Sequence, residues 1–272
     1  MTTRPTPPTG IAAILTVART SSAGALRRGR LVGLVLLVGF ACVVQAVALA
    51  FGEGRGSGFA SFVDVVDSVY LGFVIPLALV YLGTAAFGDE WEGGTAPYLV
   101  GLPLARRDIV LGRWLVSGAR GLLLVLPAVL VFYALCVAPH EGAFLEYLPD
   151  VAVIVGLLAA LCLGYLAVFL FMGVVLKRAV MASFAYVLVF ETAISRLPPG
   201  LATISLSFHT RNLMTQLTGN DQFSRQLFPD VELPSVAQSA SMLAVYVAVF
   251  LGASAFSLRR KEVSGEALPA TE

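Results

Sequence analysis

The sequence predicts an all-α polytopic membrane protein with six transmembrane helices. Hydrophobic residues make up 58% of the 272 positions and charged residues only 13%, whereas soluble domains carry roughly 25% charged residues. The mean hydropathy of +0.86 fits a chain whose solvent is mostly lipid. Six apolar stretches approach the ~20 residues that a helix needs to cross a bilayer core. They are too long, and alternate too weakly, for barrel strands of about 10 residues.

The predicted membrane domain covers residues 31–258, between a tail with an interfacial helix (1–30) and a second tail (259–272). Prolines inside spans are tolerated because neighbouring helices and hydroxyl side chains can satisfy the freed carbonyl groups. The six predicted spans are Leu31 to Phe51, Ser68 to Gly88, Trp114 to Ala138, Val151 to Leu176, Ala179 to Leu197 and Ala240 to Leu258.

The positive residues predict the orientation of these spans. Of the 18 Lys and Arg residues, 14 fall on one side, namely Arg4, Arg19, Arg27, Arg28, Arg30, Arg106, Arg107, Arg113, Arg120, Lys177, Arg178, Arg259, Arg260 and Lys261. The other side has Arg55, Arg196, Arg211 and Arg225. Because positive residues concentrate on the cytoplasmic side, both termini are expected there.

The N-terminal region contains an apolar stripe at helical spacing. Ile11, Ile14, Leu15 and Ala18 recur on one face, and Arg19 follows them. This pattern is typical of a helix that lies in the membrane interface with its arginines near anionic head groups. A disordered basic tail is the alternative.

A long outer connection, residues 198–239, separates the fifth and sixth predicted spans. Prolines at its start end the fifth helix. Leu206, Leu213 and Leu217 then recur at helical spacing, which predicts one or two short amphipathic helices at or dipping into the outer surface. His140 and His209 both fall in outer segments, where we expect them at the protein surface.

The connection between the second and third spans, residues 89–108, is predicted to be a cytoplasmic coupling segment. Gly93 and Gly94 favour a sharp turn, after which Thr95 can cap a short helix. Asp108 is expected to cap the third transmembrane helix. The short helix would present to a partner's groove the apolar side chains Tyr98, Leu99 and Leu102. A solvated loop is the alternative.

Ionisable residues inside spans are costly and often functional. Glu191 is predicted to lie ~18 Å into the fifth span, where it either contacts substrate or a gate, or makes a structural hydrogen bond. Arg113 and Arg120 lie on one face of the third helix. They either extend to the head groups or pair with Asp89, Glu90 or Glu92 of the coupling segment.

The sequence also argues against several functions. The only lysines, Lys177 and Lys261, follow Leu176 and Arg260, so no phosphate-binding loop ending in Gly-Lys-Ser/Thr exists. The two histidines lie too far apart for a zinc-binding HExxH helix. We therefore expect no catalytic and no metal site on this chain. Three cysteines in apolar runs argue against disulfides, and a net charge of +1 argues against a nucleic-acid partner.

The coupling segment resembles that of the ABC-2 type permeases of bacterial ABC transporters. The resemblance lies in Glu92, Gly94 and Thr95, then in Leu102, Pro103 and Arg106 or Arg107, and finally in a third helix that opens with Ile109 to Arg113. The six-span plan, the N-terminal interfacial helix and the outer region before the last span are also similar to that family.

The resemblance implies an ABC-2, type V exporter-like permease fold and a subunit that is not itself an enzyme. Two copies of a separate ATPase would bind ATP and Mg, so this chain would need no cofactor. A second, identical permease would complete a dimer within the lipids of a bacterial cytoplasmic (inner) membrane. The N-terminal helix and the coupling segment would transmit closure of the ATPase pair and so open or close a path for an exported substrate.

Two other functions predict different features. A secondary transporter would show internal repeats and several buried ionisable residues, and we find neither in the sequence. A membrane assembly factor without transport activity is the other alternative. A neighbouring gene for a stand-alone ATPase would favour the permease over both.

Overall fold

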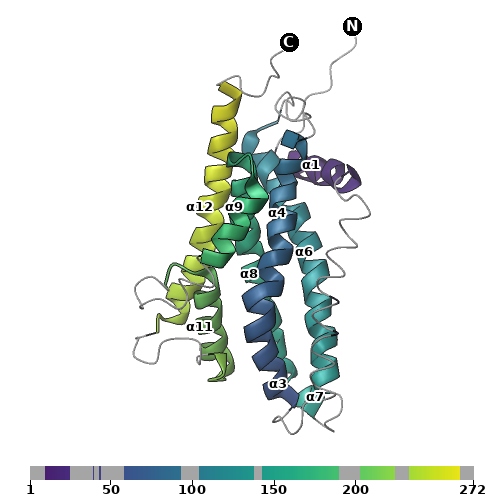
Figure 1. The fold of residues 1–272 in the computed structure, drawn as a ribbon, viewed down its shortest axis with the longest axis vertical. Helices are drawn as coiled ribbons and strands as arrows, with labels where there is room; N and C mark the ends of the chain where they lie inside the picture. Colours follow the sequence, from purple (N-terminus) through teal and green to yellow (C-terminus); the bar gives the residue numbers. More distant parts are fainter. Residues whose placement is uncertain are drawn as a thin grey trace.

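The computed structural model describes residues 10–24, 39, 43, 58–92, 104–137, 143–189, 203–223 and 233–263. The described elements are helices, and no strand occurs among them. They form an elongated bundle (Figure 1). Four helices are long and apolar enough to cross a membrane: Gly58–Gly88, Arg106–Val137, Leu148–Val175 and Val236–Arg260. The all-helical membrane architecture is thereby confirmed.

Two predicted spans are described only in part. The first, Leu31 to Phe51, lies outside the described residues except for Gly39 and Val43. The fifth is represented by a shorter apolar helix, Ala179–Val189, which includes α9 (Ala179–Tyr186). The residues from 190 to 202 lie outside the described part of the chain.

The second span begins earlier than the sequence suggested. It runs without a break through α3 (Gly58–Val65), the π-helix η1 (Val66–Val74) and α4 (Ile75–Glu92). The predicted start at Ser68 was wrong because Asp64 and Asp67 interrupt the apolar run. Asp64 is exposed, whereas Asp67 is buried next to a positive partner, so neither carboxylate ends the helix.

The remaining helices begin and end at recognisable signals. They are α1 (Ile11–Gly24), α6 (Arg106–Val137), α7 (Ala143–Glu146), α8 (Leu148–Val175), α11 (Leu206–Thr218) and α12 (Val236–Val263). Gly219 ends α11 with a left-handed φ of 64°, and its N–H donates to the Thr215 carbonyl. Ser235 and Gln238 bond each other's backbone N–H groups, so they form a capping box at the start of α12.

Helix α8 is the centre of the bundle and packs against α4, α6, α9, α11 and α12. Small residues let α4 and α8 approach closely. A Cβ atom on Gly83 would lie 2.6 Å from the Phe169 Cβ, and one on Gly173 would lie 2.9 Å from the Thr84 carbonyl oxygen. Close backbone approach of this kind is a common basis for helix association in membranes.

Candidate functional site

One end of the bundle gathers α1 and the last turns of α12 (Figure 1). An apolar cluster, which we call the hub, joins five helices there. Its buried members are Val17 of α1, Phe87 of α4, Ile109 and Val110 of α6, Leu170 and Val174 of α8, and Leu258 of α12. Four helices long enough to cross a membrane thus share one packing centre with the short N-terminal helix.

Helix α1 is seated on α6 at a glycine. Ala13 and Val17 are buried, and Gly112 of α6 lies directly beneath them. A Cβ atom on Gly112 would lie 2.9 Å from both the Ile14 carbonyl oxygen and the Val17 Cβ, so a larger residue would force the helices apart. On the other side of α1, Ile11 is 78% exposed and Leu15 is 51% exposed.

The predicted stripe on α1 therefore divides between two surroundings. Ile11 and Leu15 point away from the protein, while Ile14 and Ala18 are half-buried towards α6. Arg19, at the following position, is exposed. The two buried residues of α1, Ala13 and Val17, do not belong to the predicted stripe. Helix α1 therefore has two apolar faces: one packs against the protein, and the described part of the protein does not cover the other.

Arg113 ties α6 to the end of α4. Its Nη1 donates to the Ala86 carbonyl oxygen, and its guanidinium lies over the Phe87 ring, 4.7 Å from the ring centroid. The side chain is buried, which argues against the first of its two predicted alternatives, extension to the head groups. An arginine over an aromatic face gains from the ring quadrupole, and this gain increases when water is excluded.

The first turn of α6 also differs from the expectation. The helix begins at Arg106, so Asp108 lies within its first turn rather than at the cap position. The Asp108 carboxylate is buried at the positive end of the helix dipole, 3.6 Å from the Arg107 Nε. Arg106 is buried, whereas the Arg107 side chain is 73% exposed.

The structure describes both flanks of the coupling segment but not its middle. Glu92 is the last residue of α4 and Arg106 the first of α6, and both helices meet in the hub. The other predicted coupling residues lie outside the described part of the chain; these are Gly94, Thr95, Tyr98, Leu99, Leu102 and Pro103. Glu191 also lies outside it.

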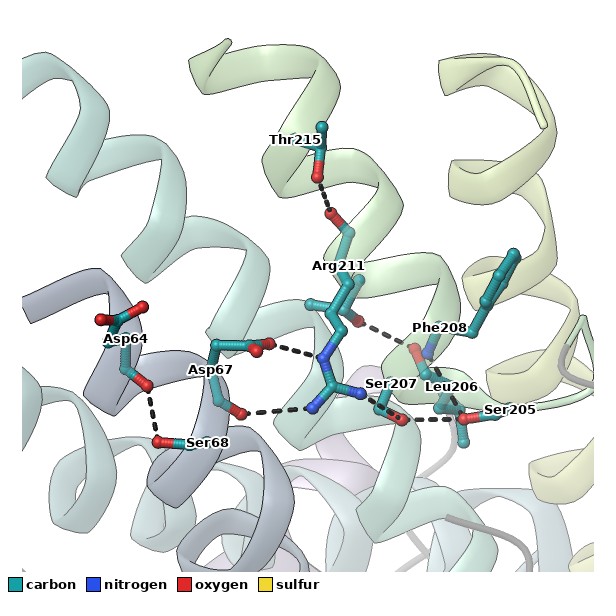
Figure 2. A network of polar contacts seen from close by, with 10 residues as sticks. Asp64, Asp67, Ser68, Ser205, Leu206, Ser207, Phe208, Arg211 and Thr215 are labelled. Carbon is teal, nitrogen blue, oxygen red and sulfur yellow. Dashed lines mark hydrogen bonds and ion pairs between the residues drawn. The ribbon is translucent and has the colours of Figure 1, made fainter. Parts of the chain in front are cut away.

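A polar cluster occupies the opposite half of the bundle, where α11 lies beside α8 and α12 (Figure 1). Arg211 Nε donates to Asp67 Oδ1 at 2.5 Å, and Arg211 Nη2 donates to the Asp67 carbonyl oxygen at 3.2 Å (Figure 2). Both side chains are buried. The pair links η1 to α11 across 144 positions of sequence.

A second network holds α11 to the start of α12. His209 Nε2 donates to the Thr203 carbonyl oxygen at 2.8 Å, which fixes Nδ1 as the acceptor from Ser239 Oγ in the neutral imidazole. Asn212 Nδ2 donates to the same Ser239 Oγ at 2.8 Å and to the Pro234 carbonyl oxygen. Both ring nitrogens of His209, the Ser239 hydroxyl and the Asn212 amide nitrogen are therefore all hydrogen-bonded.

His209 is buried, contrary to the expectation that it lies at the surface. Burial lowers the pKa of its imidazole, and the hydrogen bond to Thr203 opposes this only in part. The neutral form is favoured, as the network with Ser239 requires.

The Asp67–Arg211 pair was missed by sequence reasoning. The sequence singles out Glu191 as the one carboxylate well inside a span, but Asp67 lies within the second span and Arg211 is not an outer surface charge. One signal was available, because large apolar residues recur at helical spacing across Asp67, namely Phe59, Phe62, Val66 and Tyr70. That pattern would have extended the helix back to Gly58. No local signal indicates the partner.

Comparison with known proteins agrees with this architecture. A family model described as ABC-2 family transporter protein matches residues 15–263, from within α1 to the end of α12. No curated protein matches the chain. With its apolar helices, the chain is a multi-pass membrane protein and a permease of an ABC transporter. Because the match covers most of the sequence, the chain belongs to the ABC-2 family of transporter proteins.

Proposed function

We propose that this chain exports a substrate across the bacterial cytoplasmic membrane, driven by ATP that a separate ATPase subunit hydrolyses. The observation that carries the proposal is the hub. Residues 93–103 leave α4 and return to α6, and both helices pack in the hub with α1, α8 and α12. A push on this segment would therefore reach four candidate membrane spans through direct side-chain contact.

The proposed complex contains two ATPase copies and a second, identical permease, with ATP and Mg bound by the ATPase. We place the hub at the cytoplasmic face, together with both termini. Exposed cations gather at the helix ends around it: Arg107, Lys177, Arg178, Arg259 and Arg260. Their position supports this orientation, because positive residues concentrate on the cytoplasmic side of membrane proteins.

In the same arrangement α1 lies in the membrane interface. Its seat on Gly112 supports this placement, since it leaves Ile11 and Leu15 free to enter the acyl region while Arg19 lies among the head groups. Movement of α1 would then be transmitted directly to α6.

Co-purification with the ATPase tests the coupling segment. We expect Tyr98, Leu99 and Leu102, changed together to glutamate, to abolish co-purification while the permease still inserts and folds, because an exposed apolar surface at this position needs a partner to cover it. A matched control changes Phe144, Leu145 and Leu148, which are exposed on α7 and the start of α8, away from the hub. Undiminished ATPase yield with the first variant, or equal loss with both, would refute the assignment.

Orientation is tested separately. A cysteine at Ser224 should react with an impermeant thiol reagent added outside intact cells, and a cysteine at Ala96 should react only after the membrane is opened. The reverse pattern would place the coupling segment outside the cell and remove the basis for an ATPase contact there.

A further inference from the structure

The Asp67–Arg211 pair joins two oppositely charged side chains that are both buried. Asp67 lies nine residues after Gly58, about 14 Å into the helix. A Cβ atom on Gly164, in the middle of α8, would lie 2.7 Å from Leu206 Cδ2, so α11 begins level with the middle of the bundle. Charges at such a depth are costly in a bilayer and mark functional positions.

The pair also controls the start of α11. Arg211 Nη1 lies 3.5 Å from Ser207 Oγ, which lies 2.8 Å from Ser205 Oγ (Figure 2). Ser205 is the N-cap of α11, and its Oγ accepts from the Phe208 N–H at 3.3 Å. Loss of the ion pair would therefore disturb the cap as well as the side-chain contact.

On the other side, Asp67 lies in a π-helix. The nine residues of η1 have a wider register than an α-helix, as shown by the Ile75 N–H that donates to the Tyr70 carbonyl oxygen. Most π-helical segments are single turns, and they occur frequently at functional sites. Conversion of η1 to an α-helix would rotate α3 about the helix axis relative to α4, and would carry Asp67 away from Arg211.

The two neighbours of η1 are held by different partners. Helix α4 is fixed on α8 through Gly83 and Thr84, whereas α3 packs on α6. Helix α11 packs mainly on α8 and α12 and meets η1 chiefly at the ion pair. A change of register in η1 would therefore leave α4 in place and act on α11 through the Asp67–Arg211 contact.

We propose that the Asp67–Arg211 pair and the π register of η1 form a latch on the outer half of the bundle. While the pair is made, η1 keeps its π register and α11 remains seated between α8 and α12. When the pair opens, η1 can adopt α-helical register and α11 is released. The latch needs no ATPase, so it can be tested apart from the proposed function.

Hydrogen exchange on the full chain in lipid nanodiscs tests the latch. Asp67→Asn keeps the shape of the side chain, and Arg211→Gln removes the other charge. We expect each to speed amide exchange about ten-fold or more in two segments at once, 66–74 and 206–218, while exchange in Leu148–Val175 of α8 stays as in the wild type. The double variant should show no more than the larger single effect, because both changes remove one interaction.

Asp64→Asn is the matched control, because it removes a carboxylate one turn away that is exposed and does not bond Arg211. It should leave exchange in both segments unchanged. The latch is refuted if only α11 responds, if the two single effects add, or if Asp64→Asn acts like Asp67→Asn. Loss of folded protein with Asp67→Asn would also refute it, since a latch must open without unfolding the bundle. If Arg211→Gln does not fold, the test is the comparison of amide exchange in the two segments between Asp67→Asn and Asp64→Asn.

Discussion

The two halves of this bundle differ in how much polar bonding supplements their apolar packing. Around the hub, five helices meet through apolar side chains. Of the charged residues beside it, Arg113 lies over an aromatic ring, and Arg106 and Asp108 are buried in the first turn of α6. In the opposite half, α11 buries the apolar side chains of Leu206, Leu213 and Met214, and it is held in addition by an ion pair and a chain of hydrogen bonds among buried polar groups. A close-packed apolar cluster passes a displacement from one helix to the next, whereas each bond of a polar network is either made or broken. The hub is therefore suited to passing on movement and the polar half to switching between states.

The largest effect is expected in the polar half. Asp67→Ala leaves Arg211 buried without its carboxylate, and breaking such a pair typically costs about 3–5 kcal/mol. The change should be measurable as a matching loss in the free energy of unfolding, by denaturant titration in mixed micelles.

Asp67→Leu combined with Arg211→Met provides the comparison, because apolar replacement of both partners is often neutral or stabilising. The double variant should regain most of the stability lost in Asp67→Ala. If both proteins are equally destabilised, the contribution of the pair to stability is not electrostatic, and the contrast between the two halves is weakened.

A smaller effect is expected at the hub. Gly112→Ala places a Cβ atom 2.9 Å from the Ile14 carbonyl oxygen, a backbone atom that cannot move without its helix. Overpacking of this kind costs about 1–3 kcal/mol. We expect α1 to detach, seen as faster amide exchange in Ile11–Gly24. The control is Gly156→Ala on α8, where no atom lies within 4 Å of the added Cβ atom, so exchange in α1 should not change. If this control also speeds exchange in α1, the contact between α1 and Gly112 is not what protects the helix.

The contrast between the halves also separates what the sequence could predict from what it could not. Continuous apolar runs predicted helices that correspond to α6, α8 and α12, and the motif from Glu92 to Arg113 indicated the family that the family model identifies. These signals are local. The Asp67–Arg211 pair joins residues 144 positions apart, and the π register of η1 depends on packing, so neither can be read from neighbouring residues. The apolar residues at helical spacing did predict a short helix at or dipping into the outer surface, which corresponds to α11, but not the partners of its buried side chains.

Acid should affect the two halves differently. Since the folded-state pKa of His209 lies below its value in the unfolded chain, the unfolded chain takes up the proton more readily. The stability that neutral His209 provides is therefore fully present above the ordinary histidine pKa of about 6.5 and is lost as the pH falls through it. After correction for the intrinsic pH dependence of amide exchange, protection in α11 should fall on acidification, while protection in α1 should not.

His209→Gln tests this assignment, because a glutamine amide can bond similar groups but does not titrate in this range. The protection of α11 amides in this variant, corrected for the intrinsic pH dependence of exchange, should not change with pH. A pH response that survives the substitution would have to come from another group, and His209 would then be a structural residue without a role in acid sensitivity.

Replacement of Arg107 is expected to change the free energy of unfolding least, but to weaken binding of the ATPase clearly. Its side chain is 73% exposed, so water screens its contact with the buried Asp108 carboxylate 3.6 Å away, and a screened contact of this kind contributes about 0.2–1 kcal/mol. Arg107→Ala should therefore barely alter unfolding. If the rim of the hub binds the ATPase, however, loss of this cation next to the coupling segment should weaken co-purification and make it more sensitive to salt.

Lys177→Ala and Arg178→Ala remove exposed cations from the turn between α8 and α9 and serve as controls. Equal weakening by all three would indicate general attraction to the basic face, whereas a specific loss with Arg107→Ala would place the ATPase contact at the start of α6.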